Sequence, residues 1–100
     1  MSVAKVVDGS FTGTAESDPI ILDSLGGANL SISGTWVGTV ILKRSFDNGV
    51  TFTAVSGESY TTNQDLVIDD AEKDVQYMLE CTAYTSGTAV YHLGAKHSHV

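Results

Sequence analysis

The feature that most constrains this chain is a strand–turn–strand pattern over residues 36–55. Trp36–Ser45 is rich in aromatic and β-branched side chains, which suit a pleated and half-buried strand. Asp47-Asn48-Gly49 follows, and these residue types accept the positive φ angles of a tight hairpin turn. The strand pattern restarts over Val50–Val55. Because an isolated hairpin is barely stable in water, the rest of the chain has to supply further strands.

Shorter apolar or alternating runs recur along the chain, with Gly, Asp, Asn and Ser between them. Leu30–Ser33 and Val75–Tyr84 alternate, which is typical of strands with one face on a core. Ile20–Leu22 and Leu66–Ile68 are short and apolar. Thr88–Leu93 is expected to return against the long alternating strand as a second hairpin. Turn signals every eight to twelve residues, without a helical period, predict an all-β, single-domain antiparallel β-sandwich, jelly-roll-like, with about eight short strands.

The length of one hundred residues corresponds to a single domain. Residues 1-10 show no clear period and are expected to form an N-terminal arm. Residues 11-94 are expected to form the β-sandwich domain, with a first strand over Phe11–Ala15 and a loop over residues 56–64. Residues 95-100 are interpreted as a flexible C-terminal tail.

The expected core follows from the alternation in the two longest strands. The apolar residues of Trp36–Ser45 occupy both faces as far as Leu42, so we expect both faces of this strand to be covered. In the later strand, Gln76 is expected to point outward between inward-facing apolar neighbours. The predicted core anchors are Trp36, Val40, Leu42, Tyr77, Leu79 and Cys81.

The charge and cysteine content exclude several classes of function. The formal net charge is −7, from twelve acidic and five basic side chains, whereas nucleic-acid binding draws on clustered Lys and Arg. We therefore expect no nucleic-acid partner. No apolar run approaches the roughly 20 residues that cross a bilayer, and residues 1-10 lack the apolar segment of a secretory signal, so no membrane partner is expected. Cys81, the single cysteine, is expected to be a buried thiol of a protein that folds in a reducing cytosol.

Side chains able to carry chemistry are present but scattered. Ser86 lacks the Gly-x-Ser-x-Gly surroundings of a hydrolase nucleophile. The acidic residues of 69–74 lack the spacing of a calcium loop and are interrupted by Lys73. His92 and Cys81 both fall in predicted strands, with no rigid turn to bring them to one zinc ion. We expect no catalytic activity, no metal site and no cofactor.

Aromatic side chains allow a second interpretation, a sugar-binding face. Sugar stacking needs exposed rings that lie side by side. The opposite interpretation places the tryptophan in the core and the tyrosine rings inside, with their hydroxyls at the rim. The residues concerned are Trp36, Tyr60, Tyr84 and Tyr91.

Two segments resemble a pattern that recurs in small structural proteins of tailed bacteriophages. Residues 34–52 contain its aromatic-x-Gly-Thr-Val start, its basic-Ser-x-Asp-x-Gly turn and its Thr-aromatic strand. Residues 75–88 contain its Tyr-x-Leu-x-Cys and Thr-Ser-Gly elements. The resemblance implies a β-sandwich that decorates or cements a capsid, or that belongs to a tail or a head fibre.

On this resemblance, the expected function is that of a non-enzymatic bacteriophage virion structural protein, with a capsid decoration or cement subunit favoured. Its expected partners are other virion proteins, the major capsid protein first, and copies of itself, with a trimer favoured. The expected location is the virion, after synthesis in the bacterial host cytoplasm. A carbohydrate-binding module, displayed on the virion, is the alternative, as is a tail or head-fibre component. The apolar side chains expected to form the assembly interface are Val3, Val6, Val7 and Phe11.

Overall fold

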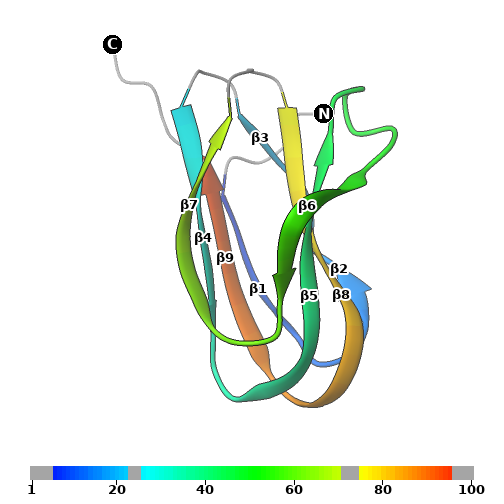
Figure 1. The fold of residues 1–100 in the computed structure, drawn as a ribbon, viewed down its shortest axis with the longest axis vertical. Helices are drawn as coiled ribbons and strands as arrows, with labels where there is room; N and C mark the ends of the chain where they lie inside the picture. Colours follow the sequence, from blue (N-terminus) through cyan, green and yellow to red (C-terminus); the bar gives the residue numbers. More distant parts are fainter. Residues whose placement is uncertain (1–5, 23–25, 71–74, 96–100) are drawn as a thin grey trace.

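The computed structural model describes residues 6–22, 26–70 and 75–95, so residues 96–100 of the expected tail lie outside the described residues. These ranges form nine strands and contain no helix long and apolar enough to cross a membrane. The strands are β1 (Val6–Phe11), β2 (Ala15–Glu16), β3 (Ile20–Leu22), β4 (Gly26–Ser33), β5 (Trp36–Ser45), β6 (Thr53–Tyr60), β7 (Gln64–Asp70), β8 (Val75–Gly87) and β9 (Ala89–Ala95). They build two antiparallel sheets packed face to face (Figure 1). The expected all-β sandwich is confirmed.

The two sheets take up the strands in the order of a jelly roll. The four-stranded sheet has the order β1-β9-β4-β7. The five-stranded sheet has the order β2-β8-β5-β6, with β3 also paired to β8. β2 and β3 both lie along the edge of β8 opposite β5, so they act as one interrupted strand, and the nine strands correspond to eight. The chain therefore passes repeatedly from one sheet to the other, as in the two Greek keys of a jelly roll.

The interruption between β2 and β3 is held by Ser17. Its backbone N–H donates to the Leu79 carbonyl (2.8 Å), and its Oγ accepts a hydrogen bond from the Leu79 N–H (2.9 Å). Both backbone groups of Leu79 thus stay bonded while the chain bends toward Pro19, which has no N–H to donate. A proline is tolerated here because an edge strand leaves one side unpaired.

Two connections between the sheets run side by side at one end of the sandwich. One passes through Gly34-Thr35 from β4 to β5, and the other through Thr88 from β8 to β9. The Thr88 N–H donates to the Thr35 carbonyl at 2.9 Å. Gly34 has a φ of 99°, and Gly87 has a φ of 87°. A Cβ on Gly87 would lie 2.1 Å from the Thr35 oxygen, so this close crossing requires glycine.

The core fills the space between the two sheets. The buried residues among the predicted core anchors are Val40, Leu42, Tyr77, Leu79 and Cys81. The remaining one, Trp36, is only partly buried, at the start of β5 near the two crossings. The prediction that both faces of β5 are covered is wrong. Val37 on its outer face is 56% exposed, whereas Gln76, farther along the same face of the sheet, is buried under the loop after β5.

The expected N-terminal arm is wrong for the part that the structure describes. Val6–Phe11 form β1, an edge strand that pairs along its whole length with β9. The Phe11 ring is buried and stacks on Tyr91, with the ring centroids 4.7 Å apart, so it belongs to the core. Residues 12–14 lie outside any strand, and the first strand expected over Phe11–Ala15 is divided between β1 and β2.

The expected hairpin between Val75–Tyr84 and Thr88–Leu93 is also wrong. β8 pairs with β5, whereas β9 pairs with β1 and β4 in the other sheet. The Gly87-Thr88 segment therefore carries the chain across the sandwich instead of folding it back. The loop expected over residues 56–64 is part of strand β6 as far as Tyr60.

Candidate functional site

The structure separates the residues considered for chemistry. Cys81 is buried on the five-stranded sheet, and this burial raises the pKa of its thiol. His92 lies on the four-stranded sheet, on its outer face. Ser86 is exposed near the end of β8, and residues 71–74 lie outside the described residues. Within the described ranges, no group of three or more His, Cys, Asp or Glu side chains is placed to hold a metal ion.

One cross-strand row that sequence reasoning missed has the composition of a catalytic triad. Asp8, His92 and Ser31 lie opposite one another on β1, β9 and β4. The His92 Nδ1 contacts the Asp8 carboxylate. The imidazole, however, is turned over Gly94, where its Nε2 would lie 3.0 Å from an added Cβ. The histidine is thus aimed along its own strand, and the row does not form the nucleophile–base contact that catalysis by Ser31 would need.

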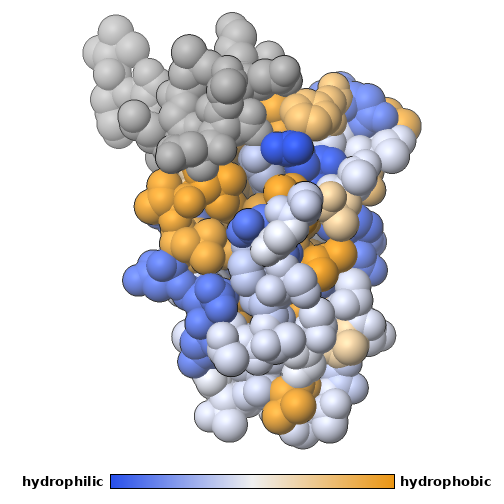
Figure 2. Space-filling model, in the orientation of Figure 1, coloured by the Kyte–Doolittle hydropathy of each residue, from blue (hydrophilic) through white to orange (hydrophobic). Residues whose placement is uncertain are grey.

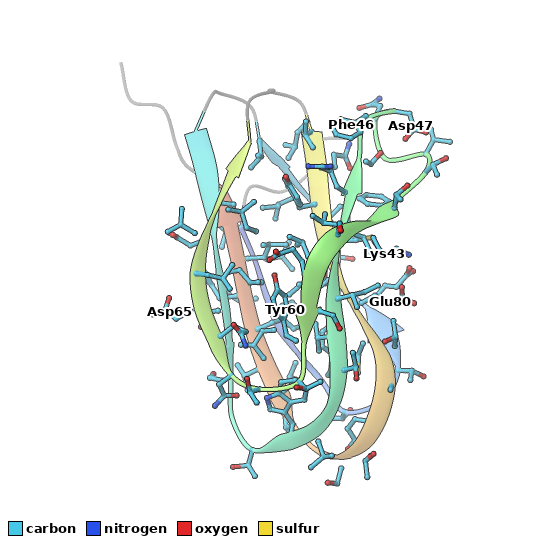
Figure 3. The ribbon with its side chains drawn as sticks, in the orientation of Figure 1. Lys43, Phe46, Asp47, Tyr60, Asp65 and Glu80 are labelled. Atoms are coloured by element: carbon cyan, nitrogen blue, oxygen red, sulfur yellow. The ribbon has the colours of Figure 1, made fainter. Side chains whose placement is uncertain are left out.

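A second cross-strand cluster lies on the outer face of the five-stranded sheet. Lys43 Nζ is 3.1 Å from Glu80 Oε1 and 3.7 Å from Glu16 Oε2, which joins β5, β8 and β2. Figure 3 shows Lys43 and Glu80 side by side on this face. Partly exposed ion pairs of this kind each contribute at most about 1 kcal/mol to stability. The cluster is therefore a cross-strand brace for the edge strand β2.

The aromatic side chains considered for sugar stacking do not form one platform. Tyr60 and Tyr91 are buried in the core, and they come from opposite sheets. Trp36 is partly buried, and its indole N–H donates to Asn63 Oδ1 at 2.8 Å. The Tyr84 hydroxyl donates to a nearby backbone carbonyl at 2.8 Å. These polar groups serve the fold, and two of the four rings have no exposed face for a sugar.

The outer face of the four-stranded sheet carries three exposed valines. Val6 on β1 is 43% exposed, Val90 on β9 is 45% exposed, and Val67 on β7 is 67% exposed. Val6 and Val67 lie in one cross-strand row, which passes through Gly94 and Asn29. The remaining outward side chains are small or polar: Ser10, Ser31, Ser33, Asp8, His92 and Asp65. Figure 3 shows Asp65 pointing away from the sandwich on this side.

The residues expected to form the assembly interface are divided between this face and the core. Val6 lies on the face. Val7, the next residue on β1, packs against the core, and Phe11 is inside it. Val3 lies outside the described residues. Because alternate side chains of β1 face the core, Val6 is the one described candidate that is available to a partner.

The predicted turn at Asp47-Asn48-Gly49 forms, inside a longer loop between β5 and β6. Asn48 has a φ of 64° and Gly49 a φ of 84°, which are the positive values expected there. Ser45 Oγ accepts a hydrogen bond from the Gly49 N–H (2.9 Å) and donates one to Asp47 Oδ1 (2.7 Å). The Thr51 N–H also donates to Asp47 Oδ1, at 2.9 Å. These bonds fix the loop. They also lower the pKa of the Asp47 carboxyl, and the bond from Ser45 has the largest effect, followed by the one from Thr51.

This loop exposes two large apolar side chains. Phe46 is 62% exposed and Val50 is 82% exposed. The Arg44 guanidinium lies over the Phe46 ring, 4.6 Å from its centroid. Figure 2 shows apolar groups at this corner of the molecule, where the loop projects in Figure 1. Gln76 lies on the outer face of β8, as the alternation predicts, but it is buried because the other side of the loop covers it, and a Cβ on Gly49 would lie 2.8 Å from its Oε1.

A cavity of about 200 Å³ lies between the sheets, on the side where β6 and β7 form their edges. A bulge in β6 makes room for it. Ile41 pairs with Ser59. Two residues farther along β5, Lys43 pairs with Ala54, so residues 55–58 lie opposite a single residue of β5. The cavity is lined by Leu42, Arg44, Val55, Glu58, Leu66, Val67, Ile68 and Tyr77.

Sequence reasoning missed Phe46, Val50 and the cavity. Comparison with known proteins does not supply what is missing: no family model matches the chain, and no curated protein matches it. A signal for the loop was present, because two large apolar residues flank a turn whose Asp-Asn-Gly centre belongs in solvent. The cavity had no such signal, since it depends on where β6 bulges against β5. Function therefore has to be inferred from the surfaces of the molecule.

Proposed function

We propose that the protein is a non-enzymatic virion subunit that binds the outside of a bacteriophage capsid and stabilises the shell, with the major capsid protein as its main partner. The proposal rests on the outer face of the four-stranded sheet, where Val6, Val67 and Val90 are exposed on three of the four strands. Contact with another protein removes these side chains from water, which is the main favourable term in association.

The regularity of this face supports a protein partner. The register of β1 on β9, of β9 on β4 and of β4 on β7 is continuous, without a bulge. The five-stranded sheet, in contrast, has register shifts in the pairing of β5 with both β6 and β8. A regular sheet face presents a smooth surface that a second protein can match over several strands. Jelly rolls serve in capsid and lectin domains alike, so the fold alone favours neither function, and it is this surface that supports a capsid partner.

The charge of the molecule favours a basic docking surface on the shell. Asp8 and Asp65 lie on the proposed docking face, and the whole chain carries a net charge of −7. Complementary charges speed encounter and orient the partners, and added salt screens them. Binding to the shell is therefore expected to weaken as the salt concentration rises.

The test is co-sedimentation with empty heads of the phage that carries the gene. We expect the purified protein to pellet with the heads at a fixed, saturable ratio to the shell protein and to raise the temperature at which the heads fall apart. Val90→Asp places a charge on the proposed face, near one end of the inner strand β9, and is expected to weaken binding at least about tenfold. Val37→Asp is the matched control, because Val37 is also exposed, at 56% against 45% for Val90, but lies on the five-stranded sheet.

Failure to bind heads would overturn the proposal, as would equal loss of binding in the Val90→Asp and Val37→Asp variants. Binding to isolated tails or fibres instead of heads would favour the alternative of a tail or head-fibre component. The carbohydrate-binding alternative predicts that added glycans quench the fluorescence of Trp36, the single tryptophan. Quenching without binding to heads would replace the present proposal.

A further inference from the structure

The cavity beside β6 and β7 has the size and lining to accept an aromatic ring. An enclosed apolar cavity of about 150 Å³ holds a benzene molecule, and this cavity, which is open to solvent on one side, measures about 200 Å³. Five of its eight lining residues are aliphatic and come from both sheets, and Glu58, Tyr77 and Arg44 add polar groups to the wall. The Arg44 side chain also lines it, and a guanidinium is a favourable neighbour for the face of an aromatic ring.

The same chain carries an exposed ring that needs such a place. Phe46 is 62% exposed and does not line the cavity of its own molecule. Its loop is fixed by the hydrogen bonds of Ser45 and Asp47, so little conformational freedom is lost when another protein binds it. A rigidly presented aromatic side chain is typical of the residues that dominate the energy of protein interfaces.

The ring and the cavity lie beside each other. Arg44 contributes to the wall of the cavity and also lies 4.6 Å from the centroid of the Phe46 ring. When a projecting side chain and a recess lie on one surface, two copies related by a twofold axis can each insert the projection into the recess of the other. A threefold ring would need the projection and the recess to lie on different sides of the subunit.

We propose that two copies of this chain form a twofold dimer in which Phe46 of each copy inserts into the cavity between β6 and β7 of the other. The dimer replaces the trimer expected from the sequence. It does not depend on the proposed docking to a capsid, although Val67 at the β7 edge belongs both to the docking face and to the wall of the cavity. Each subunit carries a charge of −7, so the two repel each other at low salt. Dimerisation is therefore expected to strengthen with salt, whereas binding to a basic shell weakens.

The experiment is sedimentation equilibrium of the full chain in about 0.5 M NaCl, which screens the repulsion between exposed charges. We expect the wild-type mass to be that of two chains. Phe46→Ala removes both insertions and is expected to weaken dimerisation at least about 100-fold. Val50→Ala is the matched control, because Val50 lies on the same loop and is more exposed, and this variant is expected to remain a dimer.

A second variant tests the cavity while leaving the ring in place. Val55→Phe is expected to fill the cavity from its own chain and so to give a monomer with Phe46 intact. Mixing it with Phe46→Ala is expected to restore a dimer held by one insertion, since one variant keeps the ring and the other keeps the cavity. Thermal unfolding of each variant shows that it is folded.

Benzene serves as a probe of the cavity. We expect it to bind Phe46→Ala, to fail to bind Val55→Phe and to dissociate the wild-type dimer. A wild-type monomer or trimer in high salt would overturn the proposal. So would a Phe46→Ala variant that dimerises like the wild type, or benzene binding to the wild type that leaves its mass unchanged.

Discussion

Ser17 binds both backbone groups of Leu79 from a position where the edge strand is broken. The serine N–H donates to the Leu79 carbonyl at 2.8 Å, and the serine Oγ accepts from the Leu79 N–H at 2.9 Å. Ser17 is itself buried, so water has little access to either bond. The Ser17 hydroxyl therefore accepts the hydrogen bond that a backbone carbonyl would accept in an unbroken edge strand. The hydrogen bonding of the sheet thus stays continuous across the break before Pro19.

Replacing Ser17 with alanine is expected to lower the free energy of unfolding by about 1–3 kcal/mol, because the buried Leu79 N–H loses its acceptor. Urea unfolding, followed by the fluorescence of Trp36, measures the change. Ser33→Ala, on an exposed position of β4, is the control and is expected to change stability by no more than about 0.5 kcal/mol. Equal stability of the Ser17→Ala variant and the wild type would show that the bond contributes nothing.

Gly87→Ala is expected to destabilise the protein by about 2 kcal/mol or more. The residue has a φ of 87°, which disfavours alanine, and the added Cβ would lie 2.1 Å from the Thr35 oxygen of the neighbouring crossing. Gly13→Ala is the control, since an added Cβ there meets nothing within 4 Å. Thermal unfolding of the two variants is the measurement. The explanation fails if the two substitutions have similar effects.

The titration of Asp47 is expected to depend on Ser45. Hydrogen bonds, the one from Ser45 first, lower the pKa of the Asp47 carboxyl in the folded state. The folded state therefore holds this proton less tightly than the unfolded state does. The resulting stabilisation is present above the ordinary Asp pKa and decreases as the pH falls through it and toward the lower folded value. We expect an NMR titration of Ser45→Ala to give a higher Asp47 pKa than the wild type, and an unchanged value would refute this.

Cys81 is expected to resist thiol reagents at pH 8 until the protein unfolds. Burial raises the pKa of its thiol, and it is the thiolate that attacks thiol reagents. The folded state keeps this proton to a higher pH than the unfolded state. Its contribution to stability is therefore complete below the ordinary thiol pKa and is lost as the pH rises above it. The rate of reaction with a chromogenic disulfide, with and without urea, measures the protection. Rapid modification of the native protein would contradict it.

The sequence predicts the strands better than their partners. The alternation of Val75–Tyr84 identifies β8, and the Asp-Asn-Gly turn after β5 forms as expected. The placement of Thr88–Leu93 failed, because a glycine-containing turn that closes a hairpin looks the same in sequence as one that crosses to the other sheet. The burial of the outward-facing Gln76 was not predicted, because its cover comes from a loop nearly thirty residues earlier in the chain. Local patterns do not contain such long-range contacts.

The candidate surfaces were harder to predict from the sequence than the strands. Val6 was expected to contact a partner, but as part of an arm and not of a sheet edge. The row of Val6 and Val67 depends on which strands flank β9 and β4, and this order is fixed by the crossings between the sheets. Phe46 gave a local signal, an aromatic side chain beside a polar turn. Its importance becomes visible only next to the cavity made by the bulge in β6.

The position of β9 between β1 and β4 has a consequence for synthesis on the ribosome. β1 and β4 do not pair with each other, so β1 has no sheet neighbour until residues 89–95 have been translated and have left the exit tunnel. The nascent chain must therefore hold β1 unpaired while residues 12–88 are translated. Closure of the four-stranded sheet is then a late event, and folding is expected to be slower than in domains built from local contacts.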